Sequence, residues 1–247
     1  MSAAILISGI VIFLSHTLEA ITGFGCAALA MPFVTSLIGM DMGVRSVTVI
    51  AWLLALYIAI SKRKEIQFKQ FLIIFGCMIA GMPAGMYIFR SLDTAVLKKV
   101  LAAFIIAVSI WQILLVMLKK PVKQGPLSAG EWVIYIILLI LGGVVHGAFS
   151  SGGPLVVLYA KRQLHDKGQF RATLCLLWSV LNTILIATYF IEGSFTGQTA
   201  IATAEFVPFL IAGIFAGEYL HGKVNEKIFS LLVFITLLVT GVFMLVF

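Results

Sequence analysis

Hydrophobic residues dominate this chain in long runs, and only short polar segments separate them. A helix of about 20 apolar residues crosses the hydrocarbon core of a bilayer, and most of the runs are at least nearly that long. The pattern therefore predicts an all-α, polytopic membrane protein. The predicted runs are 3–39, 44–61, 67–90, 95–118, 130–160, 168–190, 199–221 and 226–247.

Two of these runs contain helix-breaking residues. The run 3–39 includes Thr22-Gly23-Phe24-Gly25, and the run 130–160 is broken at 149–154. Glycine costs about 1 kcal/mol in a helix interior and proline about 3 kcal/mol, so a helix should stop at each break and a second should follow. Interrupted helices at corresponding places in two halves are typical of the binding sites of secondary transporters.

Composition supports a membrane location. Hydrophobic residues make up 62% of the chain and charged residues 11%, against about 25% charged in soluble domains. The net charge of +7 is then explained by basic cytoplasmic loops, and no nucleic-acid motif is present. The three cysteines lie in apolar runs and argue against a disulfide framework.

The distribution of basic residues favours one topology. If each broken run is a hairpin that returns to its starting side, most Lys and Arg residues fall on one side, which is then cytoplasmic. If each broken run crosses once, the split is closer to even. The hairpin topology places both termini outside the cytoplasm. The basic residues left on that outer side are Arg45, Arg90, Lys98 and Lys99.

Two motifs recur in the same order along the chain, which indicates an internal repeat. One is an arginine seven residues before a tryptophan, and the other is a pair of glycines within a stretch of small residues. We therefore expect two repeats, 1–120 and 129–247, each with a broken-helix hairpin and three transmembrane helices, and the second inverted relative to the first. Chance similarity between apolar helices is the alternative. The matches are Arg45 and Trp52 with Arg171 and Trp178, and 80–87 with 212–219.

The helix breaks are the first candidate binding site. The first N–H groups of a helix have no partner within the helix and carry a partial positive charge, so two such ends at one cavity would bind an anion. Glycines would let the backbone approach a ligand, and hydroxyl groups would donate hydrogen bonds. Close helix crossing is the alternative. The candidates are Thr22, Gly23, Phe24, Gly25, Ser150, Ser151, Gly152 and Gly153.

Three further polar residues are candidates for substrate contact. Arg45 and Arg171 begin their predicted helices, and Arg171 shares a helix stripe with Trp178 and Asn182. A buried asparagine in a membrane usually faces protein or water. The alternatives are arginines that reach the headgroups, tryptophans in the interfacial belt, and an interhelical hydrogen bond from Asn182.

Three ionisable residues in the runs could couple transport to protons. His16 and Glu19 are three residues apart on one helix face, and His146 precedes the second break. Structural hydrogen bonding between the broken helices is the alternative. Glu205 and Glu218, near helix ends, are interpreted as solvated or interfacial.

The sequence does not indicate an enzyme, a metal site or a cofactor. It contains no Walker-type loop, no HExxH and no GxSxG motif. The glycine pairs are interpreted as helix packing, and they could also mark a homodimer contact. These pairs are Gly81 with Gly85 and Gly213 with Gly217.

At these motifs the chain resembles the TauE/SafE family of sulfite exporter-like permeases. The resemblance rests on 22–25 followed by Pro32, on 147–154, on 171–173 and on Asn182. It implies transport of small sulfur-containing anions, such as sulfite, sulfoacetate or related sulfonates, across a bacterial inner membrane without an ATPase. Alternating access, with or without proton coupling, is the expected mechanism. An anion channel, or a transporter of another small solute or a metal ion, remains the alternative.

Overall fold

The computed structural model describes residues 2–118 and 127–220, together with scattered positions between 223 and 245. The regular structure in these residues is helical, which confirms the predicted all-α class. Most of the predicted last run, 226–247, and the boundary between the two predicted repeats lie outside the described residues. The helices are α1 (Ala3–Thr22), α2 (Cys26–Ile38), α3 (Met40–Ser61), the short 3-10 helix η1 (Arg63–Glu65), α4 (Phe68–Ser91), α5 (Thr94–Met117), α6 (Ala129–Phe149), α7 (Gly153–Gln163), α8 (Lys167–Ile191) and α9 (Gly197–Leu220).

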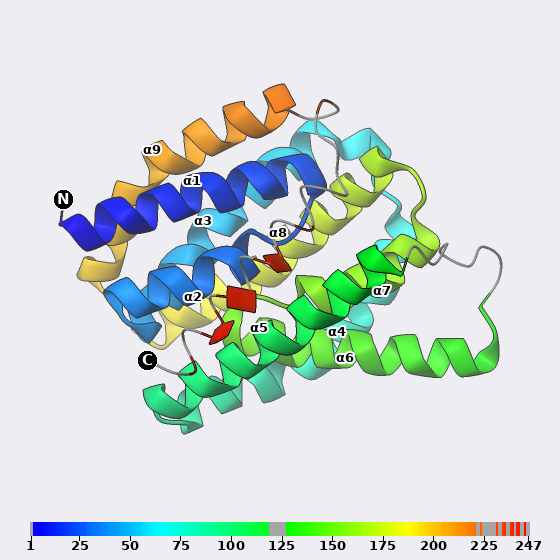
Figure 1. Cartoon of the computed structure of the whole chain (residues 1–247), viewed down its shortest axis with the longest axis horizontal. Coiled ribbons are helices and arrows are strands. Elements are labelled where there is room, and N and C mark those ends of the chain that lie inside the picture. The colour runs from blue at the N-terminus through cyan, green and yellow to red at the C-terminus, as the bar shows by residue number, and fades with distance from the viewer. Residues whose placement is uncertain are drawn as a thin grey trace.

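Both predicted breaks are turns between two helices. Gly23 and Gly25 have φ angles of 84° and 104°, in a left-handed region that glycine adopts without a steric penalty, and they end α1 and begin α2. Ser150 ends α6 with a φ of 51°. In Figure 1, α2 runs back toward the end of the molecule where α1 begins, and α7 runs back toward the start of α6.

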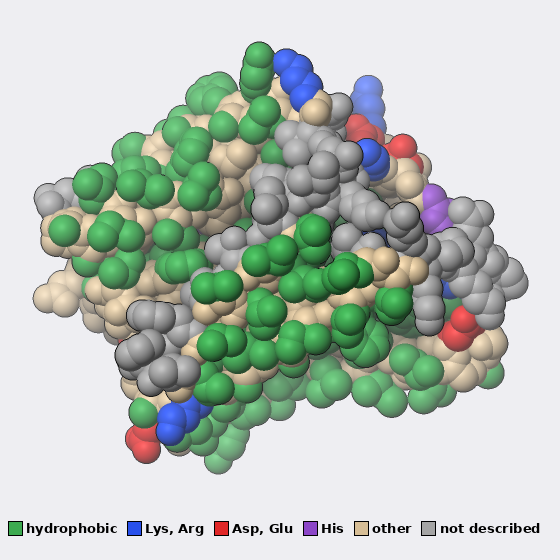
Figure 2. All heavy atoms as spheres, in the orientation of Figure 1, with side chains coloured by type: hydrophobic (Ala, Val, Ile, Leu, Met, Phe, Trp, Pro, Cys, Tyr) green, Lys and Arg blue, Asp and Glu red, His purple; other side chains and the backbone are tan. Residues whose placement is uncertain are grey.

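The long helices form an apolar body. Seven helices among the described residues are long and apolar enough to cross a membrane, whereas α2 has 13 residues and α7 has 11. On the face drawn in Figure 2, hydrophobic side chains cover the middle and charged side chains lie toward the edges. These features are those of a multi-pass membrane protein in which the two short helices belong to hairpins.

Packing between helices follows a simple scheme. The helix α4 packs along α6, α9 packs along α1, and α3 packs against α8. The buried sides of α3 and α8 include Leu54, Ile58 and Leu181, each at most 1% exposed. The two hairpin turns lie against α8, so that helix connects the two breaks in space.

Glycines allow α4 to pack closely on α6 and α9 to pack closely on α1, as their spacing predicts. A Cβ atom at Gly85 would lie 1.9 Å from the carbonyl oxygen of Val144, and one at Gly217 would lie 2.3 Å from the Cβ of Ala20. These glycine faces are therefore occupied within the chain, and they do not supply the homodimer contact that was the alternative. The glycines are Gly81 and Gly85 on α4, and Gly213 and Gly217 on α9.

Candidate functional site

One buried cavity lies between the two hairpin turns. Its empty volume is about 310 Å³ when the space at its open side is included, but the enclosed part has room for only about one water molecule, so a larger ligand requires the cavity to widen. The turns that interrupt the two halves, 129 residues apart at Gly25 and Pro154, thus form walls of the same cavity. The lining residues are Glu19, Gly25, Cys26, Ala27, Ala28, Ala51, His146, Ser150, Ser151, Gly153, Pro154, Trp178 and Asn182.

The N-termini of α2 and α7 both face this cavity, but a side chain caps only one of them. The N-terminus of α2 is occupied by a carboxylate, because Oε2 of Glu19 accepts a hydrogen bond from the Cys26 N–H at 3.0 Å. The N-terminus of α7 begins after Gly152, and no side chain caps it. Pro154 lies in its first turn, where the missing N–H costs no helical hydrogen bond. The cavity therefore has one capped and one uncapped helix end.

The helix α8 holds both turns through side-chain hydrogen bonds. The Ser150 hydroxyl donates to Oδ1 of Asn182 at 2.7 Å, and Nε1 of Trp178 donates to the Gly23 carbonyl at 3.1 Å. Asn182 and Trp178 are 2% and 5% exposed. The predicted stripe of α8 thus faces the protein interior, and the interfacial position considered for Trp178 does not apply.

His146 is the buried side chain of the cavity without hydrogen-bond partners. It is 1% exposed, and its ring stacks on Trp178 with 5.6 Å between the ring centroids. Neither ring nitrogen has a hydrogen-bond partner of good geometry, although the Asn182 side chain is close by. A buried histidine in this state is able to bind a further polar group.

His16 lies away from the cavity lining. Its Nδ1 is 2.8 Å from the Ile12 carbonyl oxygen and 3.1 Å from the Ser15 hydroxyl, while Nε2 has no partner. His16 therefore does not line the cavity, whereas Glu19 and His146 do.

Four of the predicted site residues shape the turns without lining the cavity. Thr22 donates its hydroxyl hydrogen bond to backbone carbonyls, that of Leu18 at 2.9 Å among them. A Cβ atom at Gly23 would lie 2.7 Å from the Cα of Arg171, so this glycine permits close packing against α8. The four residues outside the lining are Thr22, Gly23, Phe24 and Gly152.

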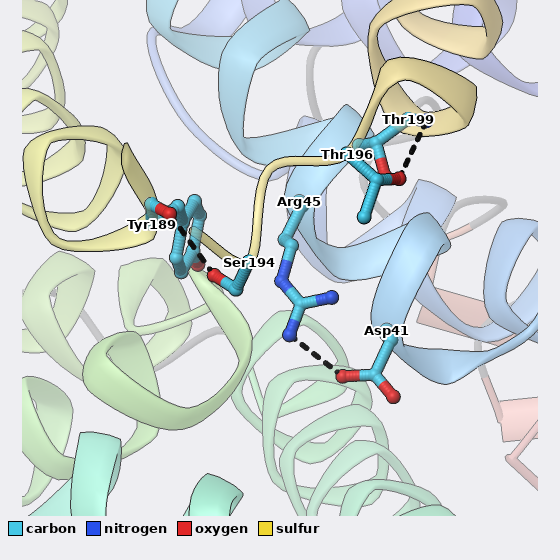
Figure 3. A network of polar contacts seen from close by, with 6 residues as sticks. All are labelled: Asp41, Arg45, Tyr189, Ser194, Thr196 and Thr199. Atoms are coloured by element: carbon cyan, nitrogen blue, oxygen red, sulfur yellow. Dashed lines mark hydrogen bonds and ion pairs between the residues drawn. The ribbon is translucent and has the colours of Figure 1, made fainter. Parts of the chain in front are cut away.

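The two repeated arginines lie in different surroundings. Arg171 is 2% exposed and forms an ion pair with Glu218 of α9. Arg45 pairs with Asp41 at 2.9 Å on its own helix, and its guanidinium lies 5.9 Å from the centre of the Tyr189 ring (Figure 3). Neither arginine lines the cavity between the turns.

Arg45 instead lines a second cavity of about 330 Å³ at the far end of α8. Figure 3 shows its guanidinium between Asp41 and the segment that carries Tyr189 and Ser194. Arg90 and Glu192 also line this cavity and form an ion pair with each other.

Sequence reasoning missed two features of these sites. Glu218 was interpreted as solvated or interfacial, but it is the partner of buried Arg171. The first half has Met86 at the corresponding place in the small-residue motif, and that difference was a signal for a special role of Glu218. The contact of Glu19 with the Cys26 N–H was also missed, because it depends on how α2 folds back.

The cavity offers several hydrogen-bonding groups. The part of the chain that the structure describes contains no group of three His, Cys, Asp or Glu residues suited to a metal ion. What the cavity offers is backbone N–H groups at helix ends, hydroxyl groups, an amide and an imidazole.

Comparison with known proteins identifies the family of the chain. Searches of curated proteins and of solved structures gave no match. A family model described as "Sulfite exporter TauE/SafE" matches residues 8–244, which include both hairpins and every lining residue of the cavity. The chain therefore belongs to the TauE/SafE sulfite exporter family, whose members are membrane transporters and not enzymes.

Proposed function

We propose that this protein is a secondary transporter that binds a small sulfur-containing anion in the cavity between the two hairpin turns. Sulfite, sulfoacetate and related sulfonates are the proposed substrates. The observation that carries the proposal is that the N-termini of α2 and α7 line one buried cavity. Both helix ends present N–H groups and a partial positive charge, which favour an anion without a buried Lys or Arg.

The side chains around the cavity suit the oxygen atoms of such an anion. Ser150 holds the oxygen of the Asn182 amide, so the amide nitrogen remains as a donor. His146 has two ring nitrogens without partners. The Ser151 hydroxyl donates to the Phe149 carbonyl at 2.9 Å and would turn its O–H toward the anion on binding. We propose that these groups replace the water that the anion loses on binding.

Alternating access between two inverted repeats, 1–120 and 129–247, is the mechanism that we propose. The most extensive helix contacts support it, because they correspond between the two halves. The contact of α4 with α6 corresponds to that of α9 with α1, and the central contact joins the equivalent helices α3 and α8. A two-fold relation between repeats would produce this scheme.

The two arginines would act on opposite sides of the cavity. Arg171 and Glu218 would close the path toward the loops that carry most of the basic residues, because Arg171 is buried beside the turn at Gly23 and Glu218 is its partner. Arg45 would attract anions into the second cavity at the other end of α8. A bacterial inner membrane, with these basic loops in the cytoplasm, is the proposed location.

A binding measurement on the purified protein tests the site. We expect sulfite, sulfoacetate or isethionate to raise the Tm relative to chloride, because a ligand at a hundredfold excess over its Kd stabilises the folded state by about 2.7 kcal/mol. Ser151→Leu would fill the cavity and abolish this shift. Ser61→Leu, at an exposed position at the end of α3, is the matched control and would keep it.

Transport in vesicles distinguishes a carrier from the alternative of an anion channel. A carrier shows saturable flux and exchanges labelled for unlabelled anion across the membrane, whereas a channel shows neither. If no anion shifts the Tm, or if Ser151→Leu keeps the full shift, the proposed site is wrong.

A further inference from the structure

We propose that the Glu19 carboxylate occupies the place of the substrate anion at the N-terminus of α2, so that an anion binds only after Glu19 takes up one proton. This inference rests on the proposed function and names the group that couples it to protons. His16, Glu19 and His146 were the candidates, and the structure favours Glu19 because its carboxylate accepts the first N–H group of α2.

The geometry makes Glu19 part of the binding site itself. Its carboxylate is 3% exposed, lines the cavity, and accepts the Cys26 N–H across a separation of seven residues. The turn through Gly23 and Gly25 fixes this separation, because α2 begins directly after it. An ionised carboxylate therefore already satisfies the first N–H group of α2.

The cavity has no positive side chain to compensate for a second negative charge. Its lining contains no Lys or Arg, and the nearby Arg171 is already paired with Glu218. A small, buried space weakens the screening of charge by water, so two anions within it repel each other strongly. Binding of the substrate anion and ionisation of Glu19 are therefore mutually exclusive.

The lining of the cavity also contains the uncapped N-terminus of α7 and the imidazole of His146. No side chain caps α7, and His146 is buried there with both ring nitrogens unpartnered. Once Glu19 is neutral, the anion would bind between this open end and the N-terminus of α2. The other titratable or charged groups around Glu19 are His16 on α1, Cys26 on α2, His146 on α6, Cys175 and Arg171 on α8, and Glu218 on α9.

The proton balance follows directly. One proton from the aqueous side adds to the Glu19 carboxylate as one anion enters, and both leave when the site opens on the other side. The cavity carries a single negative charge in either state. Anion and proton therefore move together, in a direction set by their combined gradients.

The pH dependence of binding tests this coupling. Isethionate is a suitable probe, because its sulfonate group stays ionised between about pH 5 and about pH 8. A change of its Kd within this range therefore reports the titration of the protein. For the unaltered protein we expect Kd to rise by about tenfold per pH unit once Glu19 is ionised. Glu19→Gln, a neutral isostere, should bind isethionate with a Kd that does not change with pH.

Proton uptake gives an independent readout. Calorimetric titrations with isethionate in buffers of different ionisation enthalpy should show about one proton taken up per anion by the unaltered protein, and none by Glu19→Gln. Glu131→Gln is the matched control, because Glu131 is a carboxylate in the first turn of α6, away from the cavity, and a glutamine can keep its capping role. It should take up the same proton as the unaltered protein.

The outcomes separate this inference from the proposed function. If isethionate binds with a Kd independent of pH, or if Glu19→Gln retains the proton uptake, the role of Glu19 is wrong while the anion site stands. If neither protein binds any of the tested anions, the proposed function itself is wrong. If Glu19→Gln does not fold, Glu19→Asp retains a titrating carboxylate and should keep the proton uptake.

Discussion

At the residue scale, Trp178 joins the two halves of the site. Its indole N–H holds the Gly23 carbonyl of the first turn, and its ring stacks on His146 beside the second turn. Cys175 approaches the same carbonyl at 4.0 Å, which is a weak contact. Trp178 is therefore the main polar link between the first turn and α8, and it also orients the unpartnered histidine.

Trp178→Phe should destabilise the protein. It removes the donor to Gly23 and leaves that buried carbonyl poorly satisfied, at a cost of about 1 kcal/mol. A lower Tm of the purified protein is the expected result. Trp52→Phe is the matched control at the repeated position, where the indole N–H bonds to Thr183 at 2.9 Å in more exposed surroundings. Equal losses in the two variants would contradict the special role of Trp178.

At the element scale, glycines set the distance between the outer helices and their partners. Gly143 and Gly147 on α6 face α4 as closely as the α4 glycines face α6, with an added Cβ 2.1 Å and 2.2 Å from carbonyl oxygens of α4. The neighbouring atoms are backbone atoms, which cannot move aside without shifting a helix. The α4–α6 contact therefore depends on the absence of side chains on both helices.

Gly85→Ala should separate α4 from α6 and lower stability by about 1–3 kcal/mol, the usual cost of overpacking. Gly76→Ala lies on the same helix, where an added Cβ would meet nothing within 4 Å. It should stabilise the protein by up to about 1 kcal/mol, because alanine is the better helix former. Thermal unfolding of both variants checks the prediction, which fails if the two changes have the same sign.

At the scale of the whole molecule, the ion pairs near the two ends of α8 differ in burial. The Arg171–Glu218 pair involves side chains 3% and 35% exposed, whereas the Arg90–Glu192 pair at the other end involves side chains 50% and 33% exposed. Removing the partner of the buried Arg171 is costly, because it leaves an uncompensated charge in the interior. The end at Arg171 should therefore be the more firmly closed one.

Glu218→Gln should loosen that closed end. Cys175, buried beside Arg171, is a natural reporter. We expect its labelling by a small maleimide, followed by mass spectrometry, to accelerate by about tenfold. This acceleration corresponds to a free energy of opening that is lower by about 1.4 kcal/mol. Glu192→Gln breaks the pair at the opposite end and should leave the labelling rate of Cys175 unchanged. Equal rates in both variants would show that the Arg171 pair is not a closing contact.

The sequence by itself determined the helical class, the membrane location and the places where the helices break. These features are local, because the length of an apolar run decides whether a helix spans the bilayer, and glycine and proline stop a helix wherever they occur. The turns at 23–25 and 150–152 therefore lie where the sequence predicted them. The glycine pairs also followed from spacing alone, since residues four apart share a helix face.

Only the tertiary structure decided which polar groups meet. Ser150 and Asn182 are 32 residues apart, Arg171 and Glu218 are 47 apart, and Trp178 reaches Gly23 across 155 residues. The same helices could bury these groups against other partners, and spacing along one helix cannot select among them. Packing selects them, because a buried polar atom is stable only beside the partner that the fold brings to it.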